Sequence, residues 1–185
     1  MRVEVTRLTS WKDVLNAARF TQRKEPLDKE PSEDFKRKMI KAEHSPLRCL
    51  MFNIDFYDIP YFVSVHLCRH VHCQPFVSSS RPDINKENPQ RSEQRKTDPV
   101  NMRLLLNAQE IINISKVRLC TRAERETRLA WLEAINELHK VEPLLSAACQ
   151  PSCVYRGLCP EIKTCGYVNT PAFSAVREYY CNLLV

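Results

Sequence analysis

Alternation between apolar and polar residues predicts two strands in the first third of the chain. In residues 2–8 valines alternate with charged or polar residues, which is the period-two pattern of a half-buried strand. Residues 50–59 mix aromatic and β-branched side chains and predict a second strand, which Pro60 ends. Residues 61–68 fit either a helix or a strand, since their pattern alone does not separate the two.

Apolar residues three or four positions apart predict helices elsewhere. Ser10 can cap a helix over residues 11–20, and residues 33–42 predict a short basic helix. The longest helical pattern covers residues 102–138, with an interruption near residues 120–122. The apolar face that we assign to its first half consists of Leu104, Ala108, Ile111, Ile112, Ser115 and Leu119.

Polar segments that contain prolines separate these elements. Residues 23–32 and 81–99 predict loops, because they offer little apolar surface to bury. The 185 residues show no internal repeat and suit one domain, residues 1–185, with a cysteine-rich segment at residues 149–166. The order of strands and helices predicts an α+β fold, in which a mixed or antiparallel sheet packs against several helices.

Charge and composition narrow the range of partners. A net charge of +6 favours anionic partners such as nucleotides and phosphorylated cofactors. We expect no nucleic-acid binding, because the basic residues are not interleaved with aromatic ones. Without an apolar run of membrane length or a signal-peptide core, we expect a cytoplasmic protein that contacts no membrane. The chain has only two glycines, which excludes a glycine-rich phosphate cradle.

The nine cysteines fit a reducing compartment, where thiols or a metal site are commoner than disulfides. Four of them lie late in the chain with three, five and five residues between them, and they are Cys149, Cys153, Cys159 and Cys165. Four thiolates could hold a structural zinc ion. We favour buried free thiols and expect no metal site, because these intervals do not form two Cys-x-x-Cys pairs.

Residues 69–81 concentrate cationic and hydroxyl side chains directly after an apolar run, which predicts a pocket for an anion. Their spacing resembles the signature of flavin-dependent thymidylate synthases, R-H-R-x-x-S-x-N-x-x-S-x-R-Y. Arg69, His70, Ser79 and Arg81 occupy the first, second, eleventh and thirteenth places of that signature. The third, sixth, eighth and fourteenth places depart from it, with Val71, Gln74, Phe76 and Pro82.

A second block, residues 107–128, resembles the same family in the same order along the chain. The matching positions are Asn107, Asn113, Arg118, Ala123, Glu126 and Arg128, whereas Glu124 and Thr127 depart from the family pattern. With weaker matches before them, the resemblance covers residues 1–131. Two blocks in the expected order make a chance match improbable.

The resemblance implies an enzyme that methylates dUMP to dTMP with methylenetetrahydrofolate and NADPH as co-substrates and FAD as cofactor. It also implies a homotetramer whose active sites lie between subunits. The FAD-binding residues implied are Arg69, His70, Asn107 and Asn113. The implied nucleotide contacts are His66, Ser79, Arg81 and Arg118, with Arg118 and Ser79 assigned to the catalytic group. Guanidinium groups suit the phosphate because they donate two parallel hydrogen bonds and stay charged.

Several of these assignments have structural alternatives. Asn113 could make a buried structural hydrogen bond, and Ser79 could belong to a serine-rich turn. His70 with His72 and Cys73 could be metal ligands. His66 takes the place of a family glutamine, Cys49 falls near a flavin-contacting histidine, and Val77 replaces an acidic or polar residue. These departures keep two other functions open, namely C5-hydroxymethylation of a pyrimidine nucleotide and non-catalytic binding of nucleotide or zinc on the same fold.

Overall fold

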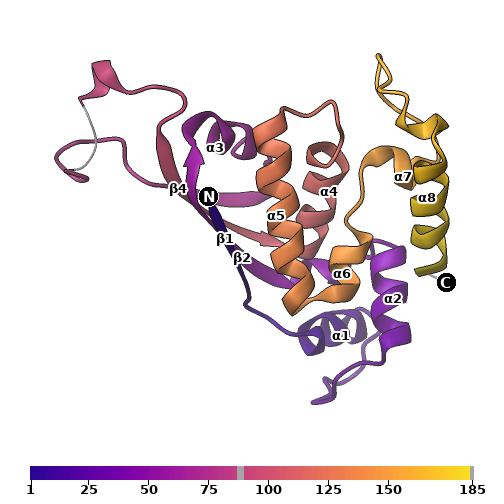
Figure 1. The fold of residues 1–185 in the computed structure, drawn as a ribbon. Coiled ribbons are helices and arrows are strands. Elements are labelled where there is room, and N and C mark those ends of the chain that lie inside the picture. Colours follow the sequence, from indigo (N-terminus) through magenta and orange to yellow (C-terminus); the bar gives the residue numbers. More distant parts are fainter. Residues whose placement is uncertain (87–89, 184–185) are drawn as a thin grey trace.

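The computed structural model describes residues 1–86 and 90–183, which fold into a four-stranded sheet with helices packed on one side of it (Figure 1). The strands are β1 (Arg2–Arg7), β2 (Met51–Pro60), β3 (Cys73–Val77) and β4 (Pro99–Asn107). The α-helices are α1 (Trp11–Phe20), α2 (Glu33–Lys41), α3 (Tyr61–Leu67), α4 (Ala108–Arg118), α5 (Arg125–Val141), α6 (Pro143–Ala148), α7 (Ser152–Arg156) and α8 (Pro171–Leu183). Short 3-10 turns lie at η1 (Ser45–Cys49), η2 (Arg91–Glu93) and η3 (Tyr167–Asn169).

The sheet has the order β1-β2-β4-β3, and every neighbouring pair is antiparallel. This confirms the α+β prediction and selects the antiparallel alternative over a mixed sheet. A bulge separates Phe56 from Ile59 in β2, and Asp58 within it has a φ of 55°. Beyond the bulge β2 ends at Pro60, and α3 starts at once, so the ambiguous segment after Pro60 is a helix.

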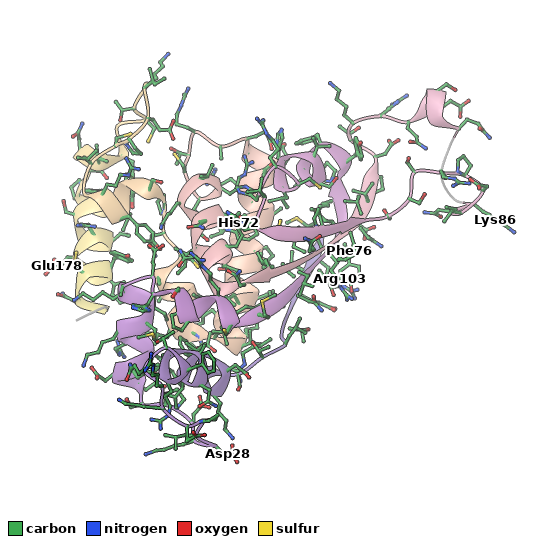
Figure 2. All side chains as sticks on the ribbon, turned by 180° about the vertical axis from the view of Figure 1, so that it is seen from behind. Asp28, His72, Phe76, Lys86, Arg103 and Glu178 are labelled. Carbon is green, nitrogen blue, oxygen red and sulfur yellow. The ribbon has the colours of Figure 1, made fainter. Side chains whose placement is uncertain are left out.

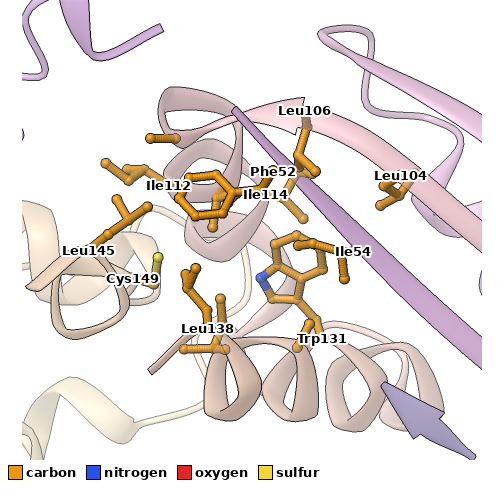
Figure 3. Close-up of a cluster of buried hydrophobic side chains, with 14 of the residues drawn as sticks. Phe52, Ile54, Leu104, Leu106, Ile112, Ile114, Trp131, Leu138, Leu145 and Cys149 are labelled. Atoms are coloured by element: carbon orange, nitrogen blue, oxygen red, sulfur yellow. The ribbon is translucent and has the colours of Figure 1, made fainter. Parts of the chain in front are cut away.

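One face of the sheet carries the hydrophobic core, because period-two alternation sends every second side chain to that face. Phe52, Ile54 and Phe56 of β2 are fully buried there. Trp131 of α5 is also fully buried, and its indole N–H donates to Ser115 of α4 at 2.9 Å. Figure 3 shows this tryptophan between the strands and the side chains of α4, α5 and α6.

The prediction of a helix from residue 102 onward is wrong for its first six residues. Residues 102–107 belong to β4, where Met102, Leu104 and Leu106 alternate inward and are buried. Leu104 and Ala108 lie four positions apart, which imitates a helical spacing across a strand-to-helix junction. Asn107 forms that junction, because its side-chain oxygen accepts a hydrogen bond from the Glu110 backbone N–H at 2.9 Å and so caps α4.

Other predicted strands, helices and loops agree with the structure. The strand at residues 2–7 and the helices at 11–20 and 33–41 are present, and Ser10 is the N-cap residue of α1. The predicted loop at residues 81–99 contains the turn η2 and leads into β4; its residues 87–89 lie outside the described part. No helix in residues 1–86 and 90–183 combines the length and apolarity needed to cross a bilayer.

The last forty residues add a small second core beside the main one. Cys153 and Val154 of α7 pack there against Phe173 of α8, with Tyr167 and Val168 at its edge. Arg177 of α8 donates to the Tyr155 carbonyl at 2.7 Å and so ties α8 to α7. In Figure 1 these two helices lie on the outer side of α4, remote from the sheet.

Candidate functional site

Arg118, at the end of α4, joins the two sequence blocks in space. Its Nε donates to His70 Nε2 at 3.0 Å, and a terminal nitrogen donates to the His66 carbonyl at 2.6 Å. His66 lies in the last turn of α3, and His70 in the turn between α3 and β3. The structure thus places three of the predicted residues in direct contact, although about 50 positions separate Arg118 from the other two.

Electrostatics keep the His70 ring neutral at this junction. Burial lowers the pKa of His70 to about 4, and the positive charges of Arg118 and Arg69 act in the same direction. Burial and the neighbouring Arg69 also lower the pKa of Arg118. His70 therefore accepts the hydrogen bond from Arg118 through Nε2 and carries its proton on Nδ1. The guanidinium supplies the positive charge of this pair.

A chain of hydrogen bonds orients His66. Its Nδ1 lies 2.8 Å from the Thr127 hydroxyl, and that hydroxyl donates to the Glu124 carboxylate at 3.0 Å. Burial opposes ionisation of Glu124, but hydrogen bonds from Glu126 and Thr127 outweigh it and lower the pKa of Glu124 to about 2. Since Thr127 gives its proton to Glu124, its oxygen accepts from His66 Nδ1–H. The ring then presents Nε2 as an acceptor.

Sequence reasoning missed this support, because Glu124 and Thr127 were noted only as departures from the family pattern. The signal that could have revealed it is the three-residue spacing from Glu124 to Thr127 at the start of a helix. Glu124 is the N-cap of α5, and its side chain accepts from the backbone N–H groups of Glu126 and Thr127. An acidic cap followed three residues later by threonine places both groups at the start of one helix.

Asn107 and Asn113 line a separate hollow of about 170 Å³ near the start of α4. The Asn113 amide donates to Glu110 at 3.2 Å and accepts from Gln109 at 3.3 Å. Asn107 caps the helix as described above. Both asparagines therefore have structural hydrogen bonds as well as a place at the hollow. Its complete lining is Arg48, His72, Asn107, Gln109, Glu110 and Asn113.

Ser79 and Arg81 lie beyond β3 in a different part of the molecule. Ser79 borders a hollow of about 280 Å³ together with Ser78, Ser80 and residues 94–96. Arg81 pairs with Asp83, with Nε 3.0 Å from the carboxylate, and its backbone N–H donates to the Ser79 hydroxyl at 3.2 Å. This hollow shares no lining residue with the one at Asn107 and Asn113.

No protein-family model and no curated protein matches the sequence. Among solved structures, the chain resembles flavin-dependent thymidylate synthase ThyX from Helicobacter pylori complexed with FAD and dUMP, at a TM-score of 0.67 and 13% identity. That match covers 81% of this chain and 100% of the other. The chain has the thymidylate synthase ThyX fold.

Further solved structures agree with this fold. A second Helicobacter pylori ThyX structure with FAD and dUMP matches at a TM-score of 0.68 and 13% identity, over 80% of this chain and 99% of that one. The UMP/dUMP methylase PolB from Streptomyces cacaoi, bound with 5-Br dUMP, matches at a TM-score of 0.60 and 13% identity. That match covers 79% of this chain and 94% of PolB.

The positions that depart from the ThyX signature lie mostly at the surface. Val71 is 81% exposed and Phe76 is 59% exposed. Seen from behind (Figure 2), Phe76 lies beside Arg103 on the open face of the sheet, where the two residues are register partners in β3 and β4. Cys49 is half-buried at the end of η1, and its carbonyl accepts from Thr9 at 2.6 Å.

The late cysteines do not gather as the zinc alternative requires. Cys149 is buried in the main core (Figure 3), and burial raises its pKa to about 12. Cys153 is buried in the second core, Cys159 is half-buried and Cys165 is exposed. In the described residues no three His, Cys, Asp or Glu side chains are arranged to hold a metal ion, and this covers the alternative set of His70, His72 and Cys73.

Proposed function

We propose that this chain is an FAD-dependent enzyme that methylates dUMP to dTMP, with methylenetetrahydrofolate and NADPH as co-substrates, and that it acts as a homotetramer. The observation that carries the proposal is the contact of Arg118 with His70 and His66. This contact joins the two sequence blocks that resemble the family. A solved structure with the same fold is complexed with FAD and dUMP. The proposal includes a location in the cytoplasm.

The polar side chains in the turn after α3 and along α4 fit a flavin. FAD, when bound, supplies the electron transfer of the reaction. Arg69 and Arg48 offer cationic groups for its phosphates, and Asn107 and Asn113 offer amides beside the hollow at α4. Neutral His70 presents an uncharged ring next to Arg118. These residues bind and orient the cofactor in our proposal.

Nucleotide binding falls to His66, Ser79, Arg81 and Arg118. The two guanidinium groups are assigned to the phosphate, and Ser79 adds a hydroxyl and a backbone N–H. Because Thr127 holds His66 Nδ1 as the donor, Nε2 can accept the N3–H of a uracil ring. A cytosine has no proton at N3, so this tautomer favours uracil. Arg118 and Ser79 are the residues proposed to act nearest the reaction.

The test uses the purified full chain reconstituted with FAD. Reduced, anaerobic enzyme should reoxidise its flavin only when both dUMP and methylenetetrahydrofolate are added, as followed by absorbance. The mass of the nucleotide product then separates methylation from hydroxymethylation, since a hydroxymethyl group retains one oxygen. A colourless protein without affinity for FAD would refute the proposal and leave a non-catalytic nucleotide-binding protein on the same fold.

An Arg118→Lys variant sharpens this test. Lysine keeps the charge but cannot bridge His70 and the His66 carbonyl with a planar fork. We expect dUMP-dependent flavin oxidation to fall by about 100-fold, on the order of 3 kcal/mol in transition-state binding. Arg125→Lys at the exposed start of α5 is the matched control and should keep the activity of the original chain.

A further inference from the structure

Glu43 adopts a strained backbone conformation directly after α2. Its φ of 44° lies in the left-handed region, which disfavours residues that carry a Cβ atom. Its N–H donates to the Ile40 carbonyl at 3.1 Å, and the His44 N–H donates to the Met39 carbonyl at 3.1 Å. These two hydrogen bonds form the Schellman motif, in which glycine is the usual residue at the position of Glu43. Glycine would therefore end α2 with less strain than glutamate does.

The side chain of Glu43 reaches α4 and contacts two residues there. Lys116 Nζ lies 2.7 and 2.8 Å from the two carboxylate oxygens, and Gln109 Nε2 donates to one of them as well. The ion pair is partly buried, with 29% of the Glu43 side chain and 25% of the Lys116 side chain exposed. These contacts join the residue after α2 to two successive turns of α4, and they offset the strain of its backbone.

The hydrogen bond to Glu43 decides which way the Gln109 amide points. A carboxylate only accepts hydrogen bonds, so it faces the NH₂ group of Gln109. The same NH₂ group donates to Asn113 Oδ1 at 3.3 Å. Both N–H bonds of the Gln109 amide are then in use, and its carbonyl oxygen is the group that Gln109 can offer to a ligand.

Asn113 takes its orientation from Gln109. Since its Oδ1 accepts from Gln109, its Nδ2 faces the buried Glu110 and donates to that carboxylate at 3.2 Å. Turning over either amide would place its oxygen against a carboxylate oxygen. Gln109, Glu110 and Asn113 all line the hollow of about 170 Å³ at α4. The direction of both amides at this hollow therefore depends on a carboxylate at each end of the row.

We propose that Glu43 is a positioning residue for the flavin site, because it fixes through Gln109 the direction of the two amides at this hollow. This inference rests on the proposed function, which takes FAD as the ligand there. In the described part of the chain Glu43 is not among the residues that line the hollow, so it acts through Gln109. The same contacts hold the segment that leads into η1, which carries Arg48 to the hollow.

Two substitutions of Glu43 separate the role of its side chain from the strain of its backbone. Glu43→Ala and Glu43→Gly both remove the carboxylate, but only glycine relieves the left-handed strain. We expect both variants to bind FAD about tenfold more weakly than the original chain in a fluorescence titration. In thermal unfolding of the FAD-free chain, the glycine variant should unfold roughly 2–4 °C above the alanine variant.

The paired readouts distinguish positioning from a purely structural role. If Glu43 only stabilised the fold, FAD affinity would follow stability, and the glycine variant would bind FAD more tightly than the alanine variant. Asp34→Asn is the matched control, since it removes the carboxylate of an exposed ion pair between Asp34 and Lys38 on α2. This control should leave FAD affinity unchanged.

A double-mutant cycle tests the route through Gln109. Gln109→Met keeps a side chain of similar length, removes the amide and should weaken FAD binding about tenfold on its own. Adding Glu43→Gly to Gln109→Met should change FAD affinity by less than about twofold, whereas independent roles would multiply to about 100-fold.

The outcomes separate this inference from the proposed function. An original chain without affinity for FAD refutes the proposed function and the role of Glu43 together. If the original chain binds FAD and the Glu43 variants bind it equally well, only the inference about Glu43 is overturned. Effects of Glu43→Gly and Gln109→Met that multiply also overturn it, because Glu43 would then act by another route.

Discussion

At the scale of single residues, the neutral His70 ring makes stability depend on pH. Its pKa falls from an ordinary 6.5 to about 4 in the folded chain, chiefly through burial. An unfolded chain therefore binds a proton between these values while the folded chain does not. Stability is present in full above pH 6.5 and is lost as the pH falls toward 4, because protonation favours the unfolded state.

We expect this loss to be on the order of 1–2 kcal/mol after allowance for partial solvent screening. Denaturant unfolding at pH 7 and at pH 4.5 measures it. His70→Gln should flatten this part of the pH profile, since glutamine accepts from Arg118 without titrating, whereas exposed His44→Gln should leave the profile unchanged. An equal slope in the His70 variant and the original chain contradicts the assignment.

Thr127 gives a second prediction at this scale, because its hydroxyl fixes the tautomer of His66. Thr127→Val preserves the shape and removes the hydroxyl from a fully buried position. His66 then loses the acceptor for Nδ1–H, and the proposed uracil contact loses its orientation. We expect the dissociation constant of dUMP to rise about tenfold, equivalent to about 1.4 kcal/mol.

Isothermal titration with dUMP measures this change. Thr127→Ser keeps a hydroxyl at the same place and should restore affinity to within about twofold of the original. If serine fails to rescue binding while the variant remains folded, the hydroxyl does not act through His66. A purely structural role predicts loss of stability in the valine variant with unchanged dUMP affinity.

At the scale of elements, the sequence predicted β1, β2, α1, α2 and α5, but it gave no prediction for β3 or for α6, α7 and α8. The error at residues 102–107 arose because β4 ends at Asn107 and α4 begins at the next residue. The inward leucines of β4 and the first residues of α4 together imitate the spacing of one helix. The partners of Asn113 are Gln109 and Glu110, four and three positions before it on α4, a spacing that the predicted helix already contained.

Asn107 has two proposed roles that substitution can separate. Its side-chain oxygen caps α4, and its amide is assigned to the flavin. Asn107→Asp keeps an oxygen at the cap, next to the positive end of the helix dipole, and removes the amide donor. We expect unchanged or slightly higher thermal stability and FAD affinity reduced about tenfold, or roughly 1.4 kcal/mol.

Asn107→Ala removes both groups and should also cost about 1 kcal/mol of folding stability. Thermal unfolding and flavin fluorescence titration give the two readouts on the same samples. Equal FAD affinity in the aspartate variant and the original chain rules out the amide contact while leaving the cap intact.

At the scale of the whole molecule, the sequence identified candidate residues but not their grouping. Arg118, His70 and His66 meet within one chain, whereas Ser79 lines a hollow with different neighbours and Arg81 pairs with Asp83. Sequence spacing cannot show this, because β3 pairs with β4 and carries residues 78–81 to the opposite end from the start of α4. We therefore propose that a nucleotide that contacts both groups takes Arg81 and Arg118 from different copies of the chain in the proposed homotetramer.

Subunit mixing tests this arrangement. Arg81→Ala and Arg118→Ala should each abolish dUMP-dependent flavin oxidation when purified alone. If one site takes Arg81 from one subunit and Arg118 from another, a tetramer that contains both variants includes sites with both arginines. Random association of equal amounts restores about one quarter of the original sites, since each position is intact with a probability of one half. Mixing must include dissociation and reassembly, and size exclusion establishes that tetramers have formed again. Activity that stays at the level of the single variants after reassembly means that each site draws both arginines from one chain, and the loop at residues 78–81 must then move toward α4 when the nucleotide binds.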